Sequence, residues 1–479
     1  MKQIITFGTE AGNNYLYNFA AGVLMPIDAA TRARIEAGKG LDNNNLLQAL
    51  SKAGSDPLWP KNGTKQWAVS LRETSADEVR RNIANLRQVC FEVTTACNLA
   101  CHYCCYGDGY STFKNRGQGS LSFGKVKAVL DYVAAALRSP ANASTDTRLA
   151  ISFYGGEPLL NMPLIRLTVG YARHITFRGR RVRFTMTTNA TQLARNMDFL
   201  AQNNFIVLVS LDGDRCGDRH RVFPDGRESF DAVIQNLRRV RDAYPEWFKT
   251  LRFNCVYTDA SDVRSIVNFF RSEFGTVPNF SPLHKSDADS EATRRMVKRL
   301  DFPEELEDDE DLLSVNPHVR MAYDFLSRGL AGYIGTEHGL MTGGRPPVWR
   351  GCMELSPCGT CAPFGKRMFV DHEGGIHPCE KVCRDSPLGH VSETGEVLLD
   401  CKEVARLHND MLAERIIRYG CDRCYKVGLC TKCLLAGGEG PCDDFCDEAR
   451  FREYLAKVVG YLERHPGLPE KIDKYIAVR

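Results

Sequence analysis

Three cysteines stand close together in the stretch Cys97-Asn98-Leu99-Ala100-Cys101-His102-Tyr103-Cys104, which directly follows the mostly apolar run 90–95. That run has the length and the β-branched and aromatic residues of a buried strand. Thiolates favour iron-sulfur clusters or zinc, and three on one loop can bind three corners of a [4Fe-4S] cube while one iron stays open. A structural zinc site, which closes four protein ligands and commonly uses CxxC pairs, is the alternative.

The composition is that of a folded globular protein, with 43% hydrophobic and 25% charged residues among 479. Lys and Arg number 62 against 59 Asp and Glu, and this net charge of +3 gives no field that favours nucleic acid or an anionic membrane. The amino-terminal residues lack a secretory signal pattern, and no apolar run is long enough to span a bilayer. We therefore expect a cytoplasmic protein with neither nucleic acid nor membrane as a partner.

The 19 cysteines are far more than a chain of this length needs. In a reducing compartment they indicate metal binding rather than disulfides. Twelve of them fall between Cys352 and Cys446, well away from the first loop. The sequence therefore predicts two metal-binding regions.

Between residues 85 and 285 a strand pattern and a helix pattern alternate six times, which is typical of βα units in a parallel sheet. Right-handed crossovers close such a series into a full or partial (β/α)6 TIM-like barrel, whose site lies at the carboxyl ends of the strands. We expect Ser122, Thr191, Ser229 and Ser261 to cap helices. The expected strands are 90–95, 148–154, 182–188, 205–211, 250–257 and 277–283, and the expected helices are 122–138, 162–175, 191–202, 229–245 and 262–273.

The flanking regions differ from this barrel. Residues 1–66 predict a small winged-helix-like α+β domain, with a three-stranded meander over 4–28 and helices over 29–36 and 44–53. Its edge strand suits an extended peptide, and a packing appendage is the alternative. Residues 286–350 are a linker or insert whose acidic run 304–311 we expect to be solvated, 351–450 a Cys-rich domain of little regular periodicity ordered by metal bonds, and 451–479 a carboxyl-terminal helix.

Polar residues follow the predicted strands at one rim of the barrel. Gly155 and Gly156 let the backbone approach a ligand closely, and the Glu157 carboxylate suits an ammonium group. Hydroxyl, amide and guanidinium groups come next, and an arginine there can hold a carboxylate bidentately. These groups predict a ligand that joins an amino acid to a nucleoside.

CxxxCxxC after the first strand, GGEP after the second and SLDG after the fourth resemble the radical S-adenosylmethionine (SAM) enzymes over about residues 90–285. The resemblance implies that Cys97, Cys101 and Cys104 hold a [4Fe-4S] cluster whose free iron chelates SAM. An electron from that cluster would cleave a carbon-sulfur bond of SAM and release a 5′-deoxyadenosyl radical. It also implies contacts to SAM from Tyr103 near the adenine, Gly155, Gly156 and Glu157 at the amino group, Ser210 at the ribose, Arg221 rather than Arg219 at the carboxylate, and Asn189 and Asn254 as weaker candidates.

The second cysteine region resembles the SPASM domain, which holds two auxiliary [4Fe-4S] clusters, whereas zinc ribbons are the alternative. Its spacing departs from the commoner pattern, with two residues rather than three between Cys430 and Cys433. The resemblance implies one cluster on Cys361, Cys379 and Cys433, which either takes Cys352 or Cys358 as well, with Cys358 taken first, or keeps an open iron. It implies another cluster on Cys421, Cys424, Cys430 and Cys446, preferred to Cys442. Cys105, Cys383 and Cys401 are expected to serve packing.

Radical enzymes with this second domain commonly act on peptides, and residues 1–66 resemble domains that bind the leader of a ribosomally made precursor. The resemblance implies a peptide maturase with SAM and three [4Fe-4S] clusters, reduced by flavodoxin or ferredoxin, that forms a Cys thioether cross-link. A sulfatase-maturing enzyme that makes formylglycine is the nearest alternative. A non-enzymatic iron-sulfur carrier or scaffold is another. His284 and Asp371 are candidate bases that do not outweigh a structural role.

Overall fold

The fold is known from a computed structural model. Eight cysteines lie in the part of the chain that it describes: Cys90, Cys97, Cys101, Cys104, Cys216, Cys255, Cys379 and Cys401. The predicted ligands Cys358, Cys361, Cys421, Cys424, Cys430, Cys433 and Cys446 lie outside it, as do Cys105, Cys352, Cys383, Cys442 and His284. The described residues are 4–18, 23–38, 69–71, 73–104, 106–107, 119–144, 147–283, 291–296, 308–316, 319, 353–355, 362–365, 367–380, 386–419, 448–468 and 470–472.

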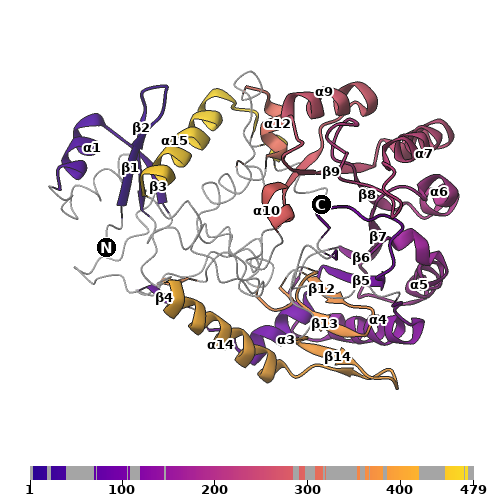
Figure 1. The fold of residues 1–479 in the computed structure, drawn as a ribbon. Coiled ribbons are helices and arrows are strands. Elements are labelled where there is room, and N and C mark those ends of the chain that lie inside the picture. Colours follow the sequence, from indigo (N-terminus) through magenta and orange to yellow (C-terminus); the bar gives the residue numbers. More distant parts are fainter. Residues whose placement is uncertain are drawn as a thin grey trace.

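Six parallel strands form the predicted partial barrel, in the order β10-β9-β8-β7-β6-β5, with helices outside them (Figure 1). The strands are β5 (Gln88–Thr94), β6 (Arg148–Gly155), β7 (Arg181–Thr188), β8 (Ile206–Ser210), β9 (Arg252–Tyr257) and β10 (Asn279–Pro282). Successive strands are joined by α4 (Phe123–Arg138), η1 (Pro158–Asn161) with α5 (Met162–His174), α6 (Leu193–Gln202), α7 (Phe230–Ala243) with α8 (Pro245–Phe248), and α9 (Val263–Phe274). All six predicted strands and all five predicted helices are confirmed within a few residues.

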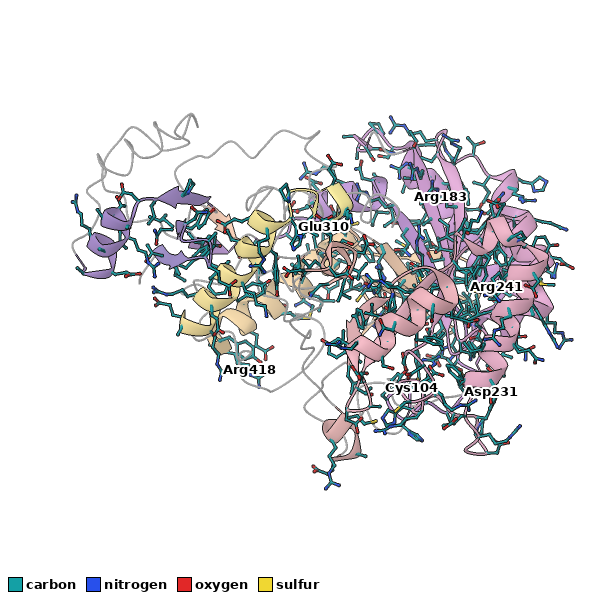
Figure 2. All side chains as sticks on the ribbon, turned by 90° about the horizontal axis from the view of Figure 1, so that it is seen from above. Cys104, Arg183, Asp231, Arg241, Glu310 and Arg418 are labelled. Carbon is teal, nitrogen blue, oxygen red and sulfur yellow. The ribbon has the colours of Figure 1, made fainter. Side chains whose placement is uncertain are left out.

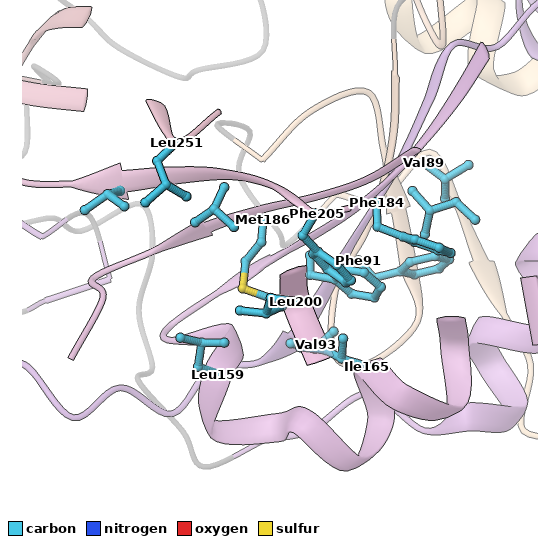
Figure 3. Packing of buried hydrophobic residues seen from close by; sticks show 14 of the residues in the cluster. Val89, Phe91, Val93, Leu159, Ile165, Phe184, Met186, Leu200, Phe205 and Leu251 are labelled. Atoms are coloured by element: carbon cyan, nitrogen blue, oxygen red, sulfur yellow. The ribbon is translucent and has the colours of Figure 1, made fainter. Parts of the chain in front are cut away.

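The alternation of side chains along each strand separates a dry outer face from a half-buried inner one. Val89, Phe91 and Val93 of β5 are buried against the helices, and the rings of Phe184 and Phe205 stack with centroids 5.5 Å apart (Figure 3). Each such buried side chain contributes roughly 1.5–3 kcal/mol. The residues between them, which include Gln88, Thr185 and Asn254, lie on the other face and are half-buried. Apolar side chains such as Leu208 and Val256 share this face, so the barrel has a half-buried inner face of polar and apolar groups that a ligand can contact.

The sheet continues beyond the barrel into the Cys-rich region. Strand β12 (Arg367–Val370) pairs with β5 in parallel, and antiparallel strands extend the sheet to ten. The expectation of little regular periodicity holds for the strands here, which at two to four residues are too short to show a period, but residues 401–419 form one helix that the sequence did not predict. The further elements are β13 (Gly375–His377), β14 (Gly389–Val391), β15 (Val397–Leu398) and α14 (Cys401–Tyr419). Cys401 packs against the main core, as predicted.

The amino-terminal unit is an antiparallel sheet of β1 (Ile4–Gly8), β2 (Asn14–Asn18) and β3 (Val23–Ile27), followed by α1 (Ala29–Glu36). Asp28 caps α1 by accepting a 2.6 Å hydrogen bond from the Thr31 N–H. Helix α15 (Glu448–Arg464) packs on β1, and the Tyr15 hydroxyl donates to the Glu463 carboxylate at 2.6 Å. The predicted meander and helix 29–36 are confirmed, whereas the predicted helix 44–53 lies outside the described residues. The domain boundaries stay predictions.

Smaller contacts connect distant segments of the chain. Asn409 of α14 exchanges two hydrogen bonds with the backbone of Thr74, beside α3. Asp309, at the end of the acidic run, caps α12 and binds Arg271, so this part of the run is paired rather than only solvated. The elements concerned are α3 (Ala76–Ala84), β4 (Val69–Leu71), which pairs in parallel with β11 (Met353–Leu355), α10 (Glu291–Met296) and α12 (Glu310–Val315).

The predicted helix caps are confirmed only in part. The Ser122 hydroxyl accepts from the Lys125 N–H at 3.3 Å, as expected. At α9 the cap is Asp262 instead of Ser261, because the carboxylate one residue later reaches the Arg264 N–H at 3.0 Å. Thr191 and Ser229 make no capping bond, since Thr191 bonds Asn189 and the Ser229 hydroxyl donates to the Arg221 carbonyl. No described helix is both long and apolar enough to span a membrane.

Candidate radical SAM site

The cysteine loop begins where β5 ends and is fixed at both of its sides. The Thr95 N–H donates to the Gly119 carbonyl at 3.0 Å, just before the loop. Farther along, the N–H groups of Ala100 and His102 donate to the carbonyls of Val222 and His220 at 2.7 and 3.0 Å. Backbone pairing with residues 220–222 therefore holds the loop over the carboxyl end of the barrel.

Cys97, Cys101 and Cys104 are all half-buried on this loop. Burial, together with negative charge on the other two thiols, raises the pKa of the Cys101 thiol to about 12, against the effect of the Arg221 charge. A bound metal centre reverses this balance, because a coordinating thiol loses its proton. These three thiols are thus a donor set that fits a cationic cluster.

The number of thiols on this loop bears on the zinc alternative. A structural zinc site closes four protein ligands, whereas a [4Fe-4S] cluster can take three thiolates, each on a different iron. The loop supplies three cysteines, which is the donor set of such a cluster.

Gly155 and Gly156 pack against the chain that leads into the cysteine loop. A Cβ at Gly156 would lie 2.5 Å from the Thr95 carbonyl oxygen and still closer to that of Ala96. The Gly156 N–H donates to the Thr94 carbonyl at 2.9 Å, and Gly155 has a φ of +129°. The sequence suggested that these glycines admit a ligand, and the structure shows that they admit the backbone of the loop itself.

The Glu157 carboxylate is completely buried and already has three donors. It accepts hydrogen bonds from the Thr188 hydroxyl at 2.7 Å, the Asn189 N–H at 2.7 Å and the Leu159 N–H at 3.0 Å. Burial raises its pKa, and these bonds oppose the rise. The carboxylate thus ties the end of β6 to the end of β7, and the predicted contact of this side chain with an ammonium group stays a prediction.

Asn189 and Ser210 lie where the sequence predicted, at the ends of β7 and β8. The Asn189 amide nitrogen donates to Asn98 at 3.0 Å and lies 3.8 Å from the Cys97 sulfur, so it belongs to the cysteine loop. Ser210 pairs in register with Asn254, whose side-chain oxygen accepts from Asn279 and Ser281. The Ser210 hydroxyl has no hydrogen-bond partner among the described residues and is half-buried, which leaves it available to a ligand.

Tyr103 and Arg221 belong to one buried network beneath the loop. The Tyr103 hydroxyl donates to Asp212 and accepts from the Arg221 guanidinium at 2.9 Å. Asp218 accepts from the Asp212 N–H at 3.0 Å and lies 3.8 Å from Arg221. Burial opposes the charge on Arg221, but Tyr103, Cys101 and the two aspartates together raise its pKa. Arg221 is therefore a permanent cation held by protein groups, whereas Arg219 is exposed and pairs with Asp259 at 3.4 Å.

Cys379 is the one predicted auxiliary ligand in the described part of the chain, just after β13. It lies near Cys90 and Arg367 of the neighbouring strands, and Arg367 pairs with Glu380 at 2.7 Å. Asp371 is buried, accepts from the Gly375 N–H at 2.7 Å and pairs with His377 at 2.8 Å. These contacts give Asp371 the structural role that the sequence favoured.

A buried Glu92–His372 pair joins the barrel to the Cys-rich region, and the sequence did not predict it. Glu92 of β5 accepts from both the N–H and the Nδ1 of His372 at 3.1 Å. A Cβ at Gly119 would clash with the His372 ring, so the ring lies directly on the residue that holds Thr95. A carboxylate at an inner position of an otherwise apolar strand was the available signal.

Part of the chain is similar in sequence to known proteins. Residues 91–259 match the model of the Radical SAM superfamily. The serine-type anaerobic sulfatase-maturating enzyme of Bacteroides thetaiotaomicron is 27% identical over 191 residues, 38% of this chain and 39% of that protein. The cysteine-type enzyme of Clostridium novyi is 28% identical over 145 residues, 30% of this chain and 37% of that protein. The chain thus spans less than half the length of the curated relatives it matches.

Among solved structures, native anSMEcpe with bound AdoMet and Cp18Cys peptide is similar to this fold with a TM-score of 0.52. The match covers 81% of this chain and 99% of that one at 16% identity, which supports the barrel fold.

Proposed function

Since the chain carries a Radical SAM superfamily domain and is an enzyme of that superfamily, we propose that it is a maturase that abstracts hydrogen from a side chain of a peptide. The observation that carries the proposal is the loop of Cys97, Cys101 and Cys104, fixed over the carboxyl end of a partial barrel with a half-buried inner face. When bound, the cluster and SAM supply a 5′-deoxyadenosyl radical.

The residues that would hold SAM are those at this rim. Ser210 offers a hydroxyl, and the Gly155–Glu157 segment offers backbone groups beside the loop. Tyr103 would lie against the adenine. Arg221 already donates one hydrogen bond to Tyr103, so it would use other N–H groups of its guanidinium for the SAM carboxylate. The inner face would position the peptide and exclude water from the radical.

We propose that the product is a Cys-derived thioether cross-link in a ribosomally made precursor. The amino-terminal sheet supports this, because β1 and β3 are its edge strands and an extended leader could add to one of them. The auxiliary clusters proposed for the second cysteine region would accept the remaining electron of the substrate. Flavodoxin or ferredoxin would supply electrons to the enzyme.

Formylglycine formation is the second candidate, supported by the names of the two sulfatase-maturating relatives. The two reactions differ in the substrate atoms that they remove. A thioether joins two residues with loss of two hydrogens and keeps the sulfur, whereas formylglycine made from Cys loses the sulfur. The peptide mass therefore separates a thioether from formylglycine made from Cys. Formylglycine made from Ser also loses two hydrogens, so labelling of its aldehyde separates that case from a thioether.

The test is to reconstitute the protein anaerobically and supply SAM and dithionite with short Cys-rich peptides encoded by neighbouring open reading frames. We expect 5′-deoxyadenosine and a modified peptide, and neither from a Cys97→Ala variant. Cys216→Ala is the matched control, because this cysteine is exposed and lies outside the loop. A protein that contains clusters but makes no 5′-deoxyadenosine would instead be an electron carrier or scaffold.

A further inference from the structure

Basic residues gather at the amino ends of β6 and β7, at the base of the barrel. No Asp or Glu occurs between Glu157 and Asp198, whereas this stretch contains Arg166, Arg173, Arg178, Arg180, Arg181, Arg183 and Arg195. Arg148 opens β6 and is the register neighbour of Arg181, which opens β7. Arg183 follows one step farther in on the inner face, opposite Ala150. The fold thus places three arginines side by side, which we call the base arginines.

The base arginines have no carboxylate partner in the part of the chain that the structure describes. Arg148 and Arg181 are exposed and Arg183 is half-buried, and none of the three forms an ion pair within the described residues. Burial, together with the charges of Arg148 and Arg181, lowers the pKa of Arg183. By contrast, exposed Arg215 and Arg406 each bind two carboxylates. Asp146, in the adjacent loop, lies outside the described residues.

This surface lies at the opposite end of the barrel from the cysteine loop. An eight-residue strand such as β6 spans roughly 25 Å from base to rim. Figure 2 shows Arg183 and Cys104 on opposite sides of the barrel. A row of register neighbours crosses four strands along the base, in the order Arg183, Ala150, Gln88 and Arg367. The distance from the first strand of this row to the last is about 15 Å. Arg367 pairs with Glu380, which adjoins Cys379, so the row ends beside a predicted auxiliary ligand.

We propose that the base arginines are the docking surface for a small acidic protein that carries one electron. The inference rests on the proposed function, because a radical SAM reaction consumes electrons that this chain does not make. Each encounter oxidises the carrier by one electron and reduces an iron-sulfur cluster of the enzyme by one. Uncompensated positive charge steers an acidic partner to its site and raises the association rate, with a strong dependence on ionic strength.

The test compares the wild type with a triple variant, Arg148→Gln, Arg181→Gln and Arg183→Gln. Reduced flavodoxin is the probe, and 5′-deoxyadenosine formation by the reconstituted enzyme is the readout. We expect the KM for flavodoxin to rise about tenfold and the salt dependence of the wild type to be lost. With dithionite in place of flavodoxin, the triple variant should react as fast as the wild type. The charge-matched control replaces three arginines that lie on helices instead of on β6 and β7: Arg195→Gln, Arg264→Gln and Arg450→Gln together.

Calorimetric titration of oxidised flavodoxin into each protein gives a second readout that needs no turnover. Equal affinity of the wild type and the triple variant would overturn the docking surface, as would an equal KM. The proposal would also fall if the triple variant lost affinity for a short DNA duplex and kept that for flavodoxin. Failure of the wild type to form 5′-deoxyadenosine with dithionite would refute the proposed function alone, and the titration would still decide the docking surface.

Discussion

Arginine side chains have opposite electrostatic environments at the two ends of the barrel. At the rim, Arg221 is buried among Tyr103, Asp212 and Asp218, so its charge is compensated inside the protein. At the base, Arg148, Arg181 and Arg183 lie next to one another without an ion pair in the described part of the chain. Compensated charge fixes a geometry, whereas uncompensated charge remains available to a partner. The difference indicates a rigid reaction end and a docking end.

The largest effect should come from removing the compensated arginine. Arg221→Ala would leave Asp212 and Asp218 buried without their cation, and breaking such a pair typically costs about 3–5 kcal/mol. We expect the free energy of unfolding in urea to fall by that amount in protein without clusters or SAM. Arg219→Ala is the control, since this exposed side chain makes only a surface pair, and its loss should cost less than about 1 kcal/mol.

Unchanged stability of Arg221→Ala would contradict the structural role of this network. If the variant also lost 5′-deoxyadenosine formation, Arg221 would act on SAM alone. The conclusion that the rim arginine serves the fold, unlike the base arginines, would then be wrong.

A second effect should come from the glycines at the rim. Gly156→Ala would push a methyl group into the carbonyl oxygens of Thr95 and Ala96, and overpacking of this kind typically costs about 1–3 kcal/mol. Because these carbonyls precede Cys97, we expect the variant to hold less iron after reconstitution as well. Gly170→Ala is the control, since a Cβ there meets no atom within 4 Å. Full iron content with wild-type stability would show that the loop can move away.

The sequence predicted the barrel well because its signals are local. The outer residues of each strand, such as Val89, Phe91 and Val93, are apolar in alternation, and the helices between strands have clear periods. The positions of Asn189 and Ser210 followed directly, since a strand that ends at a known residue puts the next one at the rim.

The sequence failed where the partner of a side chain is distant. GGEP indicated a ligand, but nothing local indicated that Glu157 also accepts a hydrogen bond from Thr188, because that contact depends on how two strand ends meet. Arg221 likewise looked available, because its contact with Tyr103 spans 118 residues. The Glu92–His372 pair joins residues 280 apart, and the local signal, a carboxylate on a largely apolar strand, does not identify its partner. The base arginines were visible in the sequence, but only the register puts Arg148 beside Arg181.

A third effect should depend on pH and concerns the contact between the barrel and the Cys-rich region. The hydrogen bond to Glu92, with added charge from Glu92, Glu373 and Asp371, raises the pKa of His372 above its usual 6.5, against the effect of burial. A group whose pKa is raised on folding stabilises the fold fully at pH values below its pKa in the unfolded chain. This contribution is lost as the pH rises through its pKa in the folded protein. We expect His372→Ala to cost on the order of 1 kcal/mol near pH 6 and less at pH 9.

The measurement is urea unfolding of the wild type and His372→Ala at both pH values. His390→Ala is the control, because this histidine of β14 is exposed. A deficit of His372→Ala that grows with pH would show that the pair is not charged in the folded protein.

The smallest effect should appear at the base. Replacing Arg148, Arg181 and Arg183 by Gln removes like charges that repel one another and breaks no ion pair among the described residues, so we expect stability to change by less than about 0.5 kcal/mol, in the stabilising direction. Urea unfolding at low salt checks the sign, and added salt should abolish the difference because it screens the repulsion. A loss of several kcal/mol would mean that these arginines hold the barrel together and that charge at the base, like that at the rim, serves the fold.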